Sequence, residues 1–338
     1  MTDVNIAVLG AGVVGLTTAL ELQTQFRNAR ITILADKFKE DTTSFVAAGL
    51  FRPSPNFSGP NETITRKWIN NSYHHWDTIR RTAEASLAGV TEISGYMFSS
   101  VSPSTVRNPY LEGLLPLYRT ATKEELNLCP GDWKYGSFLT TVLIDCGVYL
   151  PWATNKYLAT NGKIVPQTIN TFTELTGKYD VVVNCTGFGA KYLCNDKKLV
   201  PIRGQVLKVH APWVKTFFYG EYDTYIIPSF GAVTLGGCRQ YESYNLNPCK
   251  YDALAIRERC EAMLPSLKSA PLVGQRIGLR PHRDVVRIEK EVITTENGRN
   301  LKVVHNYGHG GYGVTTAPGT SKYAVELVKE MLMGNSKL

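Results

Sequence analysis

The first 22 residues of the chain are predicted to form a strand, a glycine-rich turn and a helix in direct succession. The apolar run at 4–9 predicts a buried parallel strand, and 16–22 predicts a helix. Gly10, Gly12 and Gly15 lie in the pattern G-x-G-x-x-G. In such a turn they allow, respectively, a tight bend, close approach of the backbone to a pyrophosphate, and packing of the helix on the strand. The chain is therefore predicted to begin with a dinucleotide-binding unit.

A second strand with an acidic residue behind it strengthens this prediction. The strand is predicted at 30–34, and Asp36 follows shortly after it. An acidic side chain there can bind a ribose hydroxyl of adenosine. The helix N-terminus would add free N–H groups and a partial positive charge for the phosphates. A glycine-rich turn in an unrelated α/β domain is the alternative interpretation.

The pattern of the sequence changes several times along the 338 residues, which are enough for two domains of ordinary size. After residue 54 the α/β pattern is lost, and a helix is predicted at 66–84 with Ile69, Tyr73 and Trp76 on one side. Near residue 145 the α/β pattern returns, with a helix at 152–161. From about 200 to 280 extended segments and turns prevail. The changes predict two structural units that alternate along the chain.

Two later stretches also bring glycine to the end of a predicted strand. The apolar strand at 180–184 runs into Thr186 and Gly187. Glycines also crowd residues 308–313, ahead of a final helix predicted at 320–333. Bare backbone at such junctions can approach a cofactor closely. Both junctions are predicted to lie near the one at the start of the chain.

Charge and hydropathy exclude several classes of protein. The formal net charge is +8, but Lys and Arg are scattered with no run longer than two. This distribution favours arginines that meet an anionic small molecule over a nucleic-acid surface. No apolar run reaches the length of a membrane span, and the start lacks the basic region of a signal peptide.

Cysteine and histidine spacings give no sign of a metal site. The seven cysteines contain no C-x-x-C pair, and the six histidines contain no H-E-x-x-H. An odd, unclustered set of cysteines is typical of a reducing compartment rather than a disulfide framework. No Ser-His-Asp or Cys-His arrangement is evident either, so we expect no metal and no nucleophilic triad.

The C-terminal tripeptide predicts where the protein is found. Ser336, Lys337 and Leu338 form S-K-L, the signal that the peroxisomal import receptor binds. We therefore expect the protein in the peroxisomal matrix, with the cytosol as the alternative location for part of it.

Eight motifs in order resemble the D-amino acid oxidase family of peroxisomal FAD enzymes, and within it the members that oxidise D-aspartate most closely. The resemblance covers nearly the whole chain. The motifs are GAGVVG, DTTSFVAAG at 41–49, VVVNCTG, PIRGQV, YIIP, VTLGG, GLRP at 278–281 and HNYGHGGYG.

The resemblance implies a fold of class α/β (α+β, two domains) with FAD as the cofactor. A discontinuous Rossmann-like FAD-binding domain would comprise 1–53, 145–200 and 281–338. A mainly antiparallel β substrate-binding domain would comprise 54–144 and 201–280. The residues implied to bind FAD are Gly10, Ala11, Gly12, Val13, Val14, Gly15, Asp36, Lys37, Thr43, Ser44, Gly49, Leu50, Gly310, Gly311, Gly313, Val314 and Thr315.

The resemblance also implies oxidative deamination of a D-amino acid. Hydride passes from the α-carbon to the flavin, water hydrolyses the imino acid to a 2-oxo acid and ammonia, and O₂ is reduced to hydrogen peroxide, without a protein base. Arg280 matches the arginine that binds the α-carboxylate, a task suited to a planar guanidinium. Tyr225 matches the tyrosine that shares this carboxylate, and Gly311 matches the residue whose carbonyl receives the amine.

Arg239 implies an acidic substrate, D-aspartate or D-glutamate. It stands where the members that act on acidic substrates carry an arginine. Either Tyr219 or Tyr222 could add a hydrogen bond, and Arg52 a charge from another wall. A further arginine that these members often carry has no counterpart in 217–222. Three alternatives stay open: an oxidase of neutral D-amino acids, a nicotinamide dehydrogenase, and a flavin-binding protein without turnover.

The stretch around Arg239 is predicted to form a hairpin. A three-residue loop at 229–231 would put Tyr225, Leu235, Gly237 and Arg239 on one face of the sheet. A four-residue loop would reverse this register.

Overall fold

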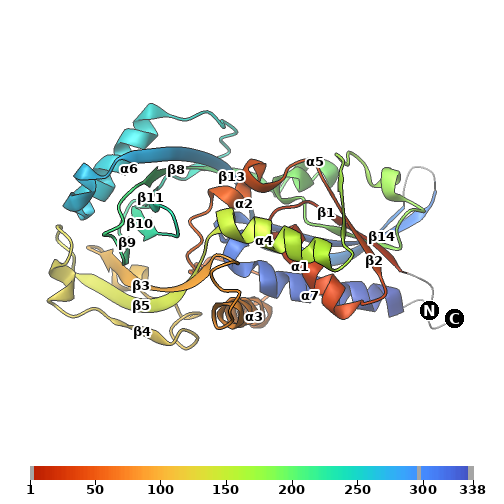
Figure 1. The fold of residues 1–338 in the computed structure, drawn as a ribbon, viewed down its shortest axis with the longest axis horizontal. Helices are drawn as coiled ribbons and strands as arrows, with labels where there is room; N and C mark the ends of the chain where they lie inside the picture. Colours follow the sequence, from red (N-terminus) through yellow and green to blue (C-terminus); the bar gives the residue numbers. More distant parts are fainter. Residues whose placement is uncertain (1–3, 295–297, 334–338) are drawn as a thin grey trace.

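The computed structural model describes residues 4–294 and 298–333, and within them the strands form one 14-stranded sheet (Figure 1). Its order is β4-β5-β3-β9-β10-β11-β8-β13-β14-β7-β1-β2-β6, with β12 paired to β8 outside this path. The strands are β1 (Asn5–Leu9), β2 (Arg30–Ala35), β3 (Val90–Ser99), β4 (Leu117–Thr120), β5 (Tyr135–Ile144), β6 (Lys163–Pro166), β7 (Val181–Asn184), β8 (Val200–Val209), β9 (Phe217–Tyr219), β10 (Tyr225–Pro228), β11 (Val233–Gly236), β12 (Gln240–Tyr241), β13 (Leu272–Thr294) and β14 (Asn300–His309).

The helices cover the parallel end of this sheet and the outside of its other end. They are α1 (Val13–Gln25), α2 (Thr43–Val46), α3 (Glu62–Arg80), α4 (Cys146–Ala159), α5 (Ala190–Leu193), α6 (Lys250–Met263) and α7 (Gly313–Met333). In Figure 1 the helices α1, α4 and α7 lie with β1, β2 and β14 on the right, and α6 lies beyond β8 on the left.

The right-hand half is the predicted dinucleotide-binding unit. Strands β14, β7, β1, β2 and β6 are all parallel neighbours in that order. Residues 6–9 of β1 are buried and apolar, as expected for a parallel strand covered by helices on both faces of its sheet. The predicted strand, turn and helix at the start of the chain are confirmed, and α1 begins directly after the glycine turn.

The left-hand half is mainly antiparallel, and β13 connects it to the parallel half. Between Leu272 and His282 this strand pairs with β8, and from Arg287 to Thr294 it pairs with β14. His282 is the shared residue, opposite Val200 on one side and His309 on the other. The strand thus runs without interruption through the predicted domain boundary at 280/281, and the domain boundaries stay a prediction.

Helix α3 ties the middle of the chain to α7. It begins four residues before the predicted 66–84, because Asn61 caps it by accepting a hydrogen bond from the Ile64 N–H at 2.9 Å. Its predicted inner face is confirmed, since Ile69, Tyr73 and Trp76 are buried. The indole N–H of Trp76 donates to the carbonyl oxygen of Thr315 at 3.0 Å.

Three further boundaries differ from the sequence prediction. Helix α4 begins at Cys146 rather than 152, because Asp145 caps it by accepting from the Gly147 N–H at 2.8 Å. Helix α7 begins at Gly313 rather than 320, directly after a 3₁₀ turn (η7, Gly310–Tyr312). The loop between β10 and β11 has four residues, since Pro228 pairs with Val233.

The four-residue loop corrects the predicted hairpin register. Tyr225 lies opposite Gly236, so it shares its face of the sheet with Gly236 and not with Leu235 as predicted. The predicted place of Gly237 beside the Tyr225 ring is confirmed, because a Cβ there would lie 2.9 Å from Tyr225 Oη. Leu235 is buried on the other face, in the core beneath α6.

Close contact between α3 and α7 generates a stability prediction. A Cβ at Gly319 would lie 1.9 Å from the Trp68 carbonyl oxygen, so Gly319→Ala forces the two helices apart. We expect a loss of about 1–3 kcal/mol in the free energy of unfolding, measured by urea denaturation. Gly231→Ala is the matched control, because its Cβ meets nothing within 4 Å. Equal unfolding midpoints for both variants would contradict this packing.

Candidate active site

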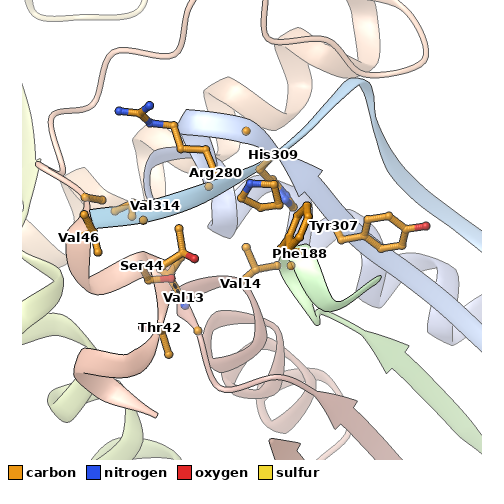
Figure 2. A pocket seen from close by; sticks show the side chains of 18 of the residues that line it. Val13, Val14, Thr42, Ser44, Val46, Phe188, Arg280, Tyr307, His309 and Val314 are labelled. Carbon is orange, nitrogen blue, oxygen red and sulfur yellow. Dashed lines mark hydrogen bonds between the residues drawn. The ribbon is translucent and has the colours of Figure 1, made fainter. Parts of the chain in front are cut away.

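A cavity of about 1020 Å³ lies where the carboxyl ends of the parallel strands meet β8, β10 and β13. Ligand pockets usually occupy about 300–1,000 Å³, so this cavity can hold a large cofactor with a small substrate beside it. Figure 2 shows Val13, Val14 and Ser44 on one side and Arg280 and His309 on the other. The guanidinium of Arg280 is directed away from Val13 and Val14.

The glycine turn brings bare backbone to this cavity. Gly10 has a φ of +102°, and a Cβ there would lie 2.6 Å from the Cys185 carbonyl oxygen at the end of β7. A Cβ at Gly15 would lie 1.9 Å from the Gly10 carbonyl oxygen. The strand ends and α1 are therefore too close for any side chain. The Val13 N–H, in the first turn of α1, donates to Ser44 Oγ at 3.0 Å.

The predicted cofactor residues come together around the cavity, with one exception. All of them line it except Gly15, which packs under the turn against Gly10. Residues 167–170, after β6, also line the cavity and were not predicted. The rule that ligands bind at the carboxyl ends of parallel strands could have identified them. Other lining residues that sequence reasoning did not assign include Phe188, Ile202, Gly204, Asp223, Cys238, Tyr241, His282, Asp284, His309 and Tyr312.

These features fit a flavin dinucleotide. Two helices, α1 and α7, begin at the cavity, and their first N–H groups can meet phosphate. Asp36 and Lys37 follow β2 on the same wall, where an adenosine ribose is bound in such folds. There is no room for a side chain at Gly10 or Gly15, so backbone atoms alone form the wall of the cavity at this turn. The residues present therefore fit the pyrophosphate and adenosine of FAD.

Arg280 and Tyr225 lie together at the other end of the site. The Arg280 Nη1 donates to the Cys238 carbonyl oxygen at 3.0 Å, and a Cβ at Gly311 would lie 3.3 Å from Arg280 Cδ. Tyr225 is packed over Gly236, where a Cβ would lie 1.9 Å from its ring. Burial raises the pKa of the Tyr225 hydroxyl, so it remains a proton donor. The structure thus brings Tyr225, Arg280 and Gly311 to one cavity.

Two more arginines line the same cavity, in different surroundings. Arg239 forms an ion pair with Asp223, Nε to Oδ1 at 2.7 Å. Burial works against the Arg239 cation, but Asp223 and Tyr312 outweigh it and the pKa of Arg239 is raised. Arg52 lies over the ring of Tyr219 at 4.2 Å, and its buried Nε has no hydrogen-bond partner.

Tyr222 was wrongly predicted to contact the substrate. It is 84% exposed and does not line the cavity. The reason is its backbone, because Tyr222 and Asp223 both have left-handed φ values, 53° and 57°, in the turn between β9 and β10. This turn directs Tyr222 to solvent, while Asp223 and Tyr219 line the cavity.

His309 is a buried cavity residue that sequence reasoning missed. Burial lowers its pKa to about 3, and its Nε2 is 3.0 Å from Thr320 Oγ1. It is therefore neutral at physiological pH and adds no positive charge to the cavity. Among residues 4–294 and 298–333 we find no His, Cys, Asp and Glu cluster suited to a metal ion. No helix in these same ranges is both long and apolar enough to span a bilayer.

The family profile described as FAD dependent oxidoreductase (DAO) matches residues 5–327. Human D-aspartate oxidase is 39% identical over 331 residues, which cover 98% of this chain and 96% of the human protein. A D-amino acid oxidase of Dugesia ryukyuensis is 31% identical over 334 residues, covering 97% and 98%. The chain therefore belongs to the DAO family of FAD-dependent oxidoreductases, and its cofactor is FAD.

Solved structures share the fold at low sequence identity. Glycine oxidase from Geobacillus kaustophilus superimposes with a TM-score of 0.77 at 16% identity, covering 96% of this chain and 94% of its own. The L-alpha-glycerophosphate oxidase of Mycoplasma pneumoniae with FAD bound gives 0.73 at 16% identity, covering 97% and 95%. The predicted fold class is confirmed by these likenesses.

The glycine turn at 10–15 generates a prediction for FAD binding. In Gly12→Val the new Cβ meets only Ser44 Oγ, at 3.1 Å, so we expect the protein to fold while the side chain fills the space near the pyrophosphate. Overpacking of about 1–3 kcal/mol corresponds to a roughly 5- to 150-fold weaker Kd for FAD, measured by flavin fluorescence titration. Gly113→Val, in open space, is the control. Wild-type affinity in Gly12→Val would refute the assignment of this turn.

Proposed function

We propose that the protein is an FAD-dependent oxidase of D-amino acids that prefers D-aspartate and D-glutamate. One observation carries the acidic preference: three arginines line the cavity within the described residues, and a substrate with a single carboxylate needs only one of them. Its relatives in humans and Dugesia ryukyuensis, a D-aspartate oxidase and a D-amino acid oxidase, support the reaction.

The proposed chemistry relies on positioning. FAD held by the glycine turn and by the first turn of α7 would supply the hydride acceptor for the substrate α-carbon, and O₂ would be the final acceptor of the two electrons, giving hydrogen peroxide. Arg280 would bind the α-carboxylate through its planar fork, with the protonated Tyr225 hydroxyl as a second donor. Gly311 lies next to Arg280, and its carbonyl would accept a hydrogen bond from the amine. These contacts fix the α-carbon relative to the flavin, and no protein base is needed once the amine is neutral.

The substrate side chain would then lie toward Arg239 and Arg52. Arg239 is the residue that we propose binds its carboxylate, because a guanidinium at a partly buried wall can hold a carboxylate by two hydrogen bonds. Tyr219 lies between Arg52 and Tyr225, with ring centroids of the two tyrosines 5.3 Å apart. The runner-up is an oxidase of neutral D-amino acids, in which Arg239 would be only a partner of Asp223.

Substitution of Arg239 separates these two functions. We expect Arg239→Ala to lower kcat/KM for D-aspartate, by a factor that can reach about 10⁴ for a site built around a charged partner, and to spare D-alanine. Steady-state rates of peroxide formation measure both. Arg280→Ala is the matched comparison and should reduce the rate with both substrates, because both carry the α-carboxylate.

Either of two results would favour the neutral-substrate oxidase. One is a wild-type enzyme with a higher kcat/KM for D-alanine than for D-aspartate. The other is an Arg239→Ala variant that loses the same factor on both substrates.

We also propose that the protein acts in peroxisomes. The support is the C-terminal tripeptide Ser336, Lys337 and Leu338, which lies outside the described residues. Hydrogen peroxide is the proposed product, and the proposed partner for import is the receptor that binds this signal.

Removal of Leu338 tests this localisation. The truncated protein should keep its activity in solution and stay in the cytosol, whereas the full chain should coincide with a peroxisomal marker in fluorescence microscopy. Import that persists without Leu338 would show that the tripeptide is not the signal.

A further inference from the structure

The turn that follows β9 holds a carboxylate in an unusual backbone conformation. Tyr222 and Asp223 both adopt left-handed φ values, and the Thr224 N–H donates to the Glu221 carbonyl oxygen at 3.0 Å. Two successive residues with positive φ are usually glycine or asparagine in a hairpin turn, and other residues there are strained. Aspartate is among the side chains that tolerate this conformation best. Such strain persists only where the surroundings hold the turn in place.

Glu221 provides that anchor. Its carboxylate accepts hydrogen bonds from the Ser100 N–H at 2.8 Å and from the hydroxyls of Ser99 and Ser100. The Ser100 N–H is the main cause of a pKa of Glu221 below its ordinary value. The Gly220 N–H also donates to the Thr224 carbonyl oxygen at 2.9 Å. Asp223 therefore sits on a short, fixed hairpin rather than on a free loop.

The Asp223 carboxylate lines the cavity and forms an ion pair with the guanidinium of Arg239. The ion pair joins Arg239 Nε to Asp223 Oδ1 at 2.7 Å, with the side chains 44% and 33% exposed. Arg239 thus already has a carboxylate partner from the protein. No such partner is found for Arg52 or Arg280 among the described residues, and the buried Nε of Arg52 has no acceptor at all.

This charge balance bears on the second carboxylate of a substrate. A dicarboxylate that reaches Arg239 has to share the guanidinium with Asp223 and lies within a few ångströms of a like charge. A substrate with only an α-carboxylate, bound at Arg280, has no group to place there. The presence of Asp223 therefore affects acidic and neutral substrates unequally.

We propose that Asp223 is a specificity-determining residue that competes with the substrate's side-chain carboxylate for Arg239 and so limits the affinity for acidic D-amino acids. This inference rests on the proposed function of Arg239. In this turn Asp223 would thus act in substrate selection, whereas its exposed neighbour Tyr222 would not.

Asp223→Asn tests this inference with little risk to the fold, because asparagine tolerates a left-handed φ as well as aspartate does. Succinate and propionate, which are D-aspartate and D-alanine without the amine, serve as probes in a titration of flavin absorbance. For an exposed ion pair we expect the Kd of succinate to fall about two- to fivefold relative to that of propionate. The KM for D-aspartate should fall by the same factor relative to that for D-alanine.

Three variants separate competition from other roles of Asp223. Asp223→Glu restores the carboxylate and should restore wild-type binding. Asp284→Asn removes another acidic group from the cavity lining and should leave the succinate to propionate ratio unchanged. In an Arg239→Ala background, Asp223→Asn should have no further effect on this ratio, because the contested guanidinium is gone.

The opposite result would overturn the inference. If Asp223→Asn weakens succinate, then Asp223 orients Arg239 for the substrate instead of competing for it. An unchanged ratio, or an effect that survives in Arg239→Ala, would likewise refute competition. If Arg239→Ala lowers kcat/KM for D-aspartate and D-alanine equally, the proposed function is wrong. If that loss is selective and only the Asp223→Asn result differs from expectation, the inference about Asp223 alone is wrong.

Discussion

The position of the active site depends on β13, because this one strand pairs with β8 in its first part and with β14 in its second part. This strand lies between β8 and β14, and its backbone N–H and C=O groups pair with β8 up to His282 and with β14 from Arg287 onward. The register of its pairing with β14 shifts between His282 and Arg287. Arg280 lies just before this shift, at the point where the antiparallel half of the sheet meets the parallel half. A side chain there faces the cavity that both halves enclose.

Close approach of backbone forms most of the cavity wall near this point. Gly10 and Gly15 let the ends of β1, β7 and α1 touch, and Gly204 and Gly236 leave no room beside Arg280 and Tyr225. Because Gly204 lies against the Arg280 side chain and Gly236 against the Tyr225 ring, these two side chains have little freedom to move. The walls therefore offer N–H groups to phosphate at one end and a guanidinium with a phenol to a carboxylate at the other.

The opposite wall differs because it is assembled from loops and a short hairpin. Arg52 follows α2, Asp223 lies in the β9–β10 turn and Arg239 precedes β12. Glu221 fixes the turn through Ser99 and Ser100, on β3 and just beyond it. The positive charge of Arg239 is thereby balanced by the negative charge of Asp223 at the place where a substrate side chain would lie. Loops on a rigid scaffold are the usual place for such selectivity.

The sequence by itself determined the parts of this protein that depend on local patterns. The strand, glycine turn and helix at its start, the acidic residue after β2 and the glycine junction before α7 need only neighbouring residues to be recognised. The tertiary structure decided the rest. One extra residue in the β10–β11 loop reversed the predicted face of Tyr225, and the backbone of a turn sent Tyr222 to solvent. The pairing of Arg239 with Asp223 joins residues whose distance depends on that turn and on the sheet between them, so no local pattern contains it.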